Sequence, residues 1–377
     1  MTGARTYLDY NASAPLRHEA RAAMVAALDL EGNPSSVHRE GRAARALIEA
    51  AREDVAALVG MRAMDVTFTS GGTEAANAVV RNGYDVVLMA DIEHDCVRAA
   101  QAASRSRHVT IAVDRHGVIS LESLSAALSG LDAKPARALL ALQLANNETG
   151  VIQPVAEAAA IARDAGADVF VDAVQAAGKM PISFGALGAH ALALSAHKIG
   201  GPKGVGAIVS APDWRLAPFL QGGGQEKRRR AGTENVAGIA GFGAAARSAV
   251  RDLGVFDHIR ELRDDLERRA KVLTPDVKIA GEGAARLGNT SALLMPEVAA
   301  ETALIRFDLA GIAVSSGSAC SSGKVGRSHV LAAMGLGARA GNAIRVSLGW
   351  NSTEDDVERF LETWRTIHAP AERRSIA

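Results

Sequence analysis

The sequence is poor in cysteine, with only Cys96 and Cys320 among its 377 residues. Two cysteines cannot build the disulfide framework of a small secreted domain, and their spacing fits neither a zinc site nor an iron–sulfur cluster. We therefore expect no disulfide framework and no resident metal. Such a chain is typical of the reducing cytoplasm.

The sequence also lacks an excess of charge and a long apolar run. Lys plus Arg and Asp plus Glu both number 42, so the net charge is zero and no basic field attracts nucleic acid or an anionic membrane. No stretch approaches the ~18 apolar residues of a membrane span, and residues 1–10 lack the pattern of a signal peptide. We expect neither nucleic acid nor membrane as a partner, and any anion must be bound locally.

What the sequence does contain is a regular alternation of apolar runs with helical segments. The runs occupy 66–69, 86–89, 109–113, 138–144, 169–171, 191–194 and 205–209. Such alternation predicts an α/β fold with a mostly parallel, seven-stranded sheet covered on both faces. Shorter runs at 277–279, 291–295, 312–314 and 343–348 predict a smaller α+β domain. We expect a large domain at 16–245 and a small domain built from 1–15 and 246–377.

The most informative stretch is 190–206, where an apolar run ends at Ser195, His197 and Lys198 and glycines follow. Open α/β sheets bind ligands beyond the carboxyl ends of their strands, so Lys198 is expected to project into a crevice. Partial burial lowers the pKa of a lysine and frees its amine to form a Schiff base with an aldehyde. Lys203 is the weaker candidate, because it follows Pro202 in a turn. A solvated surface lysine is the ordinary alternative for both.

A second signal is the stretch 68–77, Phe-Thr-Ser-Gly-Gly-Thr-Glu-Ala-Ala-Asn, which runs from a strand through glycines into a helix. Free backbone N–H groups at the helix start make such a junction an anion site, with the Thr73 hydroxyl as a further donor. The stretch matches neither the phosphate loop of nucleotide hydrolases nor the dinucleotide-binding glycine pattern. We expect it to hold a single phosphate group, with a simple helix cap as the alternative.

Polar residues also follow three other apolar runs. Asp172 ends one run and Gln175 follows it, Asn147 follows a second and His94 a third. A buried carboxylate needs a cationic partner, and a protonated pyridine nitrogen can supply one. Each residue alone is more typical of a loop cap. Together, a lysine, a carboxylate, a phosphate cradle and a flat aromatic partner are the parts that hold pyridoxal 5'-phosphate.

At this point the sequence resembles the class V aminotransferase family, and within it the cysteine desulfurases of the NifS/IscS type, over essentially its full length. The resemblance implies fold type I of the pyridoxal-phosphate-dependent transferases. The matching stretches are 7–12, 32–38, 69–74, 93–94, 146–150, 172–175, 195–198, 222–235, 315–320 and 344–349.

The resemblance also implies a role for each candidate residue. Lys198 is expected to carry the cofactor, and Thr233 to reach the phosphate bound by the partner subunit of a homodimer. Arg345 is expected to grip the substrate carboxylate, a task suited to a guanidinium. The remaining cofactor contacts are expected from Gly72, Thr73, Ser195 and His197 at the phosphate, His94 stacked on the ring and shuttling protons, Asp172 at the ring nitrogen, and Asn147 and Gln175 at the ring oxygen, with Asn147 also near the substrate.

Cys320 is the residue that discriminates between activities. Ser and Gly surround it in 315–323, which predicts a segment that lets the thiol move between the cofactor and an acceptor. We expect L-cysteine to be converted to L-alanine with a persulfide formed on Cys320 for a sulfur-acceptor or scaffold protein, as in iron–sulfur cluster assembly. A transient role of Cys320 as an iron–sulfur ligand is left open. Cys96 is expected to be a small packed residue.

Three alternatives remain at this stage. A selenocysteine lyase, or a β-eliminating or transaminating relative, would share the cofactor but not use Cys320. A non-catalytic sulfur-trafficking partner would keep only the fold. The sequence leaves open the sulfur acceptor, the turnover rate and the preference between cysteine and selenocysteine.

Overall fold

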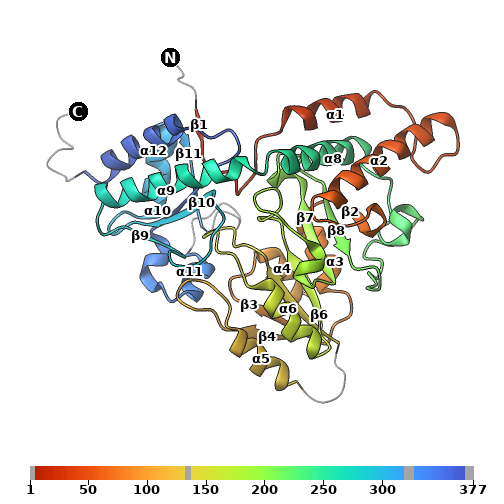
Figure 1. Ribbon diagram of the computed structural model, residues 1–377, viewed down its shortest axis with the longest axis horizontal. Coiled ribbons are helices and arrows are strands. Elements are labelled where there is room, and N and C mark those ends of the chain that lie inside the picture. The colour runs from red at the N-terminus through yellow and green to blue at the C-terminus, as the bar shows by residue number, and fades with distance from the viewer. Residues whose placement is uncertain (1–4, 132–136, 318–326, 370–377) are drawn as a thin grey trace.

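The computed structural model describes residues 5–131, 137–317 and 327–369, and its largest element is a seven-stranded sheet (Figure 1). The strand order is β2-β8-β7-β6-β5-β3-β4, in which β3 to β7 pair in parallel and β8 runs antiparallel to both β7 and β2. The prediction of a mostly parallel seven-stranded sheet is therefore confirmed. The strands are β2 (Val66–Thr69), β3 (Val86–Ala90), β4 (Arg107–Ile111), β5 (Ala138–Gln143), β6 (Asp168–Asp172), β7 (Ala191–Ser195) and β8 (Gly206–Ser210).

Helices cover both faces of this sheet, which is why its strands read as continuous apolar runs. On β5, Leu140 and Leu142 enter the core on one face, and Leu139 and Ala141 enter the core on the other. The first core is shared with α2 (Arg39–Ala57), α5 (Leu121–Ser129), α6 (Val155–Asp164) and α8 (Val236–Arg251), and the second with α3 (Gly72–Val80) and α4 (Asp95–Ala102). Helix α1 (His18–Leu28) packs on α8, and α7 (Phe184–Leu187) contacts α6.

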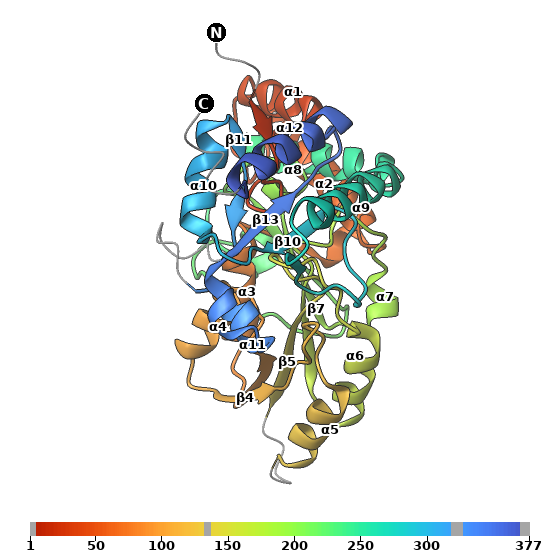
Figure 2. The ribbon, with the colours of Figure 1, turned by 90° about the vertical axis from the view of Figure 1, so that its left-hand side faces the viewer.

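A second body has its own antiparallel sheet in the order β12-β13-β10-β9. Figure 2 shows this sheet with α10 on one side and α9 on the other. Its separate core includes the stacked rings of Phe307 and Phe360, whose centroids lie 4.8 Å apart, and Trp364. Its elements are α9 (Val255–Leu273), β9 (Lys278–Ile279), β10 (Thr290–Leu294), α10 (Ala300–Leu309), β11 (Ile312–Ala313), β12 (Ser315–Ser316), α11 (His329–Ala333), β13 (Ala343–Ser347) and α12 (Glu354–Ile367).

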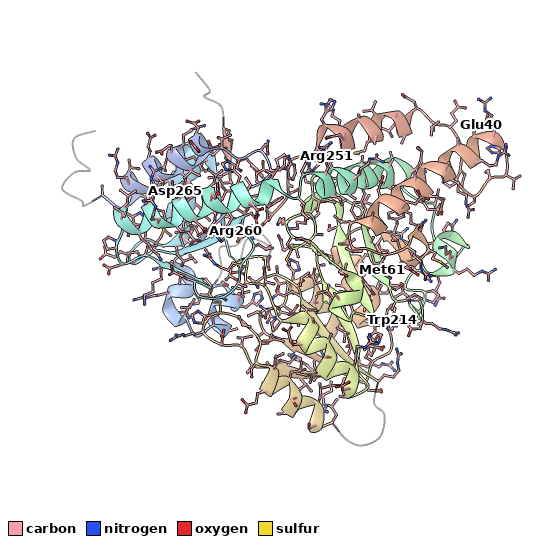
Figure 3. The ribbon with its side chains drawn as sticks, in the orientation of Figure 1. Glu40, Met61, Trp214, Arg251, Arg260 and Asp265 are labelled. Atoms are coloured by element: carbon pink, nitrogen blue, oxygen red, sulfur yellow. The ribbon has the colours of Figure 1, made fainter. Side chains whose placement is uncertain are left out.

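The N-terminal segment joins this second body, because β1 (Thr6–Tyr7) pairs in parallel with β11 and Leu8 lies in the second core. The boundary expected at residue 245 falls inside α8, whose Ala245 and Ala249 are buried against the large sheet. The next helix, α9, carries Arg260 and Asp265 on its outer face (Figure 3). The division of the chain into two domains stays a prediction.

Candidate active site

A cavity of about 270 Å³ lies at the carboxyl ends of β5, β6 and β7 and at the N-terminal ends of α3 and α4. This is many times the ~30 Å³ share of one liquid water, so it is a binding site rather than a packing gap. Nine of the predicted site residues line it: Gly72, Thr73, His94, Asn147, Asp172, Gln175, Ser195, His197 and Lys198. The polar residues that follow these strands therefore lie around one cavity.

Lys198 is placed by a single 3₁₀ turn, Ala196–Lys198, that follows β7 directly. The turn is closed by hydrogen bonds from Ile199 N and Gly201 N to Ala196 O, at 3.1 and 2.8 Å. It brings the Lys198 amine into the cavity, where Nζ donates to the carbonyl oxygens of Asn11 and Ala12. Lys203, in contrast, is exposed and does not line the cavity.

The anion cradle is the turn between β2 and α3. The N–H groups of the first turn of α3 have no intrahelical acceptor and so remain available to a ligand. Glu74 reaches back to accept from Ser70 N at 2.8 Å, which fixes the turn. A Cβ on Gly72 would lie 3.0 Å from Val174 Cγ2, and one on Gly206 only 2.7 Å from Gly71 Cα. Glycine at these two positions therefore lets the turn approach the neighbouring strands.

His197 lies beside Lys198 in the same cavity, with Nδ1 3.3 Å from Ser13 Oγ. Burial, with smaller contributions from the neighbouring amines of Lys198 and Lys203, lowers the pKa of His197 to about 4. The ring is therefore neutral at pH 7. A neutral imidazole can donate one N–H to an anion without adding a charge to the site.

Asp172 is buried at the end of β6, where its Oδ1 accepts from Val174 N at 3.0 Å. Burial raises the pKa of Asp172, while His94, the Val174 N–H and Lys198 act in the opposite direction. A carboxyl group held in this balance is suited to a ligand that brings a positive charge. The expected ring nitrogen is such a group.

His94 caps α4, and its neighbour Cys96 packs against the second core and also borders the cavity. Nδ1 of His94 accepts from Cys96 N at 3.1 Å and lies 3.0 Å from Cys96 Sγ. The proton of the neutral ring is therefore placed on Nε2. Cys96 was expected to be a small packed residue, and it is also part of the cavity wall. Burial raises the pKa of its thiol, and the hydrogen bond with His94 lowers it.

Arg345 does not line the cavity, but it is connected to it through Asn147. The Asn147 carbonyl accepts from Arg345 Nη1 at 3.1 Å, and Nη2 of Arg345 donates to Asp9 Oδ1 at 2.8 Å. The guanidinium is 1% exposed, and its Nε lacks a hydrogen-bond partner in the described structure. This buried donor is a candidate contact for a substrate carboxylate.

The two remaining predicted site residues are Thr233 and Cys320. Thr233 is exposed and lines a different pocket, together with Ser70 and Arg230. Cys320 lies outside the described residues. Among residues 5–131, 137–317 and 327–369, no group of three or more His, Cys, Asp or Glu side chains could hold a metal ion, and no helix is long and apolar enough to cross a membrane.

Sequence reasoning missed Asn11, which makes a dense network under the cavity. Its carbonyl accepts from Gln175 Nε2 and Lys198 Nζ, and its Oδ1 accepts from Lys179 Nζ and Asn289 Nδ2. Its Nδ2 donates to Asn147 O and to Thr290 Oγ1. The matched stretch 7–12 signalled that Asn11 belongs to the family pattern. It gave no role, because the partners of Asn11 are 136 or more residues away.

Comparison with known proteins agrees with this geometry. Residues 6–360 match the family model described as aminotransferase class V. A cysteine desulfurase from Cereibacter sphaeroides is 41% identical over 371 residues, which cover 95% of this chain and 94% of the relative. An IscS-like cysteine desulfurase from Mycobacterium tuberculosis is 37% identical over 388 residues, 98% of each chain.

Solved structures agree as well. A NifS-like protein from Rickettsia africae superposes with a TM-score of 0.90 at 36% identity and covers 97% of this chain and 99% of its own. A second NifS-like protein gives a TM-score of 0.89 at 32% identity, with coverage of 97% and 99%. The full-length match, the fold and the residues gathered at the strand ends lead to one conclusion: this chain belongs to the class V aminotransferase family, in the group of the NifS- and IscS-like cysteine desulfurases.

Proposed function

We propose that this protein is a cysteine desulfurase that uses pyridoxal 5'-phosphate to convert L-cysteine to L-alanine. The observation that carries the proposal is the convergence of Lys198, Asp172 and the start of α3 on one cavity. Two relatives named cysteine desulfurase, at 41% and 37% identity over nearly the whole chain, support the choice of substrate.

Class V aminotransferases use pyridoxal 5'-phosphate, and the donor set of the cavity fits this group. The free N–H groups of α3, the Thr73 hydroxyl, Ser195 and the neutral ring of His197 suit a phosphate. The buried Asp172 carboxyl suits a protonated ring nitrogen. When bound, the cofactor supplies an electron sink for the negative charge that develops at the substrate α-carbon.

The residues of the chain supply the remaining functions. Lys198 Nζ would hold the cofactor and then, once free, move the proton of the substrate α-carbon. His94 can give or take a proton through Nε2, because its Nδ1 accepts from the Cys96 N–H. Arg345 would orient the substrate carboxylate through its unpartnered Nε.

We further propose that the sulfur of the substrate is transferred to Cys320. The Cys320 thiolate would attack the substrate sulfur, so that L-cysteine and the thiol give L-alanine and a persulfide on Cys320. An acceptor or scaffold protein, such as one that assembles iron–sulfur clusters, would then take the outer sulfur.

We also propose a homodimer in which Thr233 of one subunit reaches the cofactor of the other. The exposure of Thr233 and its distance in sequence from the other phosphate donors support this arrangement.

The test is to incubate the purified holoenzyme with L-cysteine and a reducing thiol and to measure both alanine and sulfide. Cys320→Ala should keep its cofactor but lose persulfide and sulfide. Removal of a covalent nucleophile deletes a step, so the loss should exceed the ~10²–10⁴-fold typical of a general acid or base. Cys96→Ala removes the other thiol but leaves Cys320 in place, so it should still form the persulfide and release sulfide.

The alternatives predict different outcomes. Alanine formed at the parent rate by Cys320→Ala would instead favour an enzyme of the selenocysteine lyase type, and pyruvate formed in place of alanine would favour a β-eliminating enzyme. A protein that binds no cofactor would favour a non-catalytic sulfur-trafficking partner. Gel filtration over a dilution series tests the dimer, since an active, cofactor-loaded monomer would contradict it.

A further inference from the structure

Lys179 is a second lysine close to the cavity, and the proposed reaction gives it no role. It is 8% exposed, and its Nζ lies 2.9 Å from both Gln175 Oε1 and Asn11 Oδ1. No carboxylate in the described part of the chain forms an ion pair with it. Burial lowers the pKa of Lys179 well below its usual value, and the cations Lys198 and Arg345 act in the same direction.

The hydrogen bonds of Lys179 match a neutral amine. A neutral amine carries two N–H donors, whereas an ammonium group carries three. The structure offers two acceptors, the side-chain oxygens of Gln175 and Asn11. Both donors of the neutral form are therefore used, and a buried charge without a counterion is avoided.

This contact determines which way the Gln175 amide points. Its Oε1 accepts from Lys179, and its Nε2 donates to the Asn11 carbonyl at 3.0 Å. A flipped amide would place Oε1 against that carbonyl, with two acceptors facing each other, and would leave a Lys179 N–H without its acceptor. These two contacts do not use the second hydrogen of Nε2. Because Gln175 lines the cavity, this hydrogen is the donor that remains for a ligand.

We propose that Lys179 is a positioning residue that locks the Gln175 amide with its N–H group toward the cavity, so that the site selects a cofactor whose ring oxygen is a hydrogen-bond acceptor. This rests on the proposed function, because it assigns that oxygen to pyridoxal 5'-phosphate. Lys179 touches neither the substrate nor the reacting atoms. It acts through Gln175 alone.

The test is a double-mutant cycle read by cofactor binding and not by turnover. Lys179→Met keeps a similar length but removes both donors, and Gln175→Leu removes the amide that Lys179 is proposed to orient. Apoproteins are titrated with pyridoxal 5'-phosphate, and the dissociation constant and the pH dependence of the visible absorption band are recorded. Lys203→Met, at an exposed lysine, is the matched control.

We expect Lys179→Met to weaken cofactor binding by ~10–100-fold, the effect of losing one well-placed hydrogen bond to a charged oxygen. Its absorption band should titrate at a different pH from that of the parent. In the Gln175→Leu background the same substitution should have almost no further effect, because the two residues act as one unit.

The inference would be overturned if the two substitutions weakened cofactor binding additively, or if Lys179→Met bound the cofactor as tightly as the parent. A purely structural Lys179 would give the additive result together with a lower melting temperature. If Lys179→Met does not fold, Lys179→Leu, which also removes both donors, takes its place in the same cycle. A parent protein that binds the cofactor but makes no alanine from cysteine would contradict the proposed function and leave this inference standing. A parent that binds no cofactor would overturn both.

Discussion

The two bodies of the molecule contribute to the site in different ways. The seven-stranded sheet delivers its functional residues at strand ends, as with Asp172 after β6 and Lys198 after β7. The smaller sheet delivers Arg345 from the middle of β13, where the side chain is 1% exposed. A parallel sheet gathers its carboxyl ends at one edge, whereas an antiparallel strand can contribute only through the face it turns toward the cavity.

The segment around Asn11 lies between the two bodies and connects them. Its backbone N donates to Ser347 Oγ on β13, while its carbonyl accepts from Gln175 and Lys198 beside the large sheet. The large sheet therefore places the groups that we propose do the chemistry. The smaller body and the N-terminal segment fix their orientation through buried hydrogen bonds.

If the strand ends carry the chemistry, Lys198→Ala should have the largest effect. The substitution removes the amine that holds the cofactor and moves the proton, so turnover should fall by more than ~10⁴-fold while the circular dichroism spectrum is unchanged. Lys203→Ala, at the exposed lysine of the same loop, should keep parent activity. Mass spectrometry after borohydride reduction checks the assignment, and a cofactor found on Lys203 would contradict it.

The contribution of the smaller sheet should be smaller and confined to the substrate. Arg345→Lys removes the planar donor fork and should raise the KM for L-cysteine by ~10–100-fold, with cofactor binding retained. Arg339→Lys, at an exposed arginine in the turn before β13, is the control. Steady-state kinetics separate the two parameters. An unchanged KM would remove Arg345 from the proposed substrate site.

Breaking the connection between the two bodies should lower the stability of the protein. Asn11→Ala removes one hydrogen-bond partner from each of the buried groups of Lys179, Asn289 and Thr290, and we expect the free energy of unfolding to drop by about 2–4 kcal/mol. Asn33→Ala, at an exposed asparagine of the N-terminal region, should cost less than about 1 kcal/mol. Urea denaturation of both apoproteins measures the difference. Equal losses would mean that the network does not couple the bodies.

The smallest expected effect concerns the charge state of the cavity. The pKa of His197 is lowered to about 4 from an ordinary value of 6.5, so between these pH values the unfolded chain binds more protons than the folded chain. Stability should therefore fall as the pH decreases from 6.5 to 4. Because the ring is partly exposed, the contribution should stay below about 3 kcal/mol. His197→Gln should lose less stability than the parent over this range in urea titrations at several pH values.

Much of the site follows from local patterns in the sequence. The positions of Asp172, Asn147 and Lys198 follow from apolar runs that end in polar residues, because parallel strands bring their carboxyl ends together. The start of α3 follows from the glycine turn at 71–72.

The roles of Asn11, Lys179 and Cys96 did not follow from such patterns. The contact of Cys96 with His94 is local, but only the packing of α4 beside the strand ends makes Cys96 part of the cavity wall. Lys179 lies four residues after Gln175, a spacing that suggests contact, but nothing local shows that both are buried.

The sequence by itself determined the order of strands and helices, the residues at the strand ends and the anion turn, since each depends on the properties of neighbouring residues along the chain. Only the tertiary structure decided the hydrogen-bond network beneath the cavity, the connection of Arg345 to Asn147 and the separation of Thr233 from the other phosphate donors. The physical reason is that a buried polar group is defined by its partners and its distance from water. For Asn11 those partners come from β13, from the residue before β10 and from the ends of β5, β6 and β7, and they meet only when the two bodies pack together.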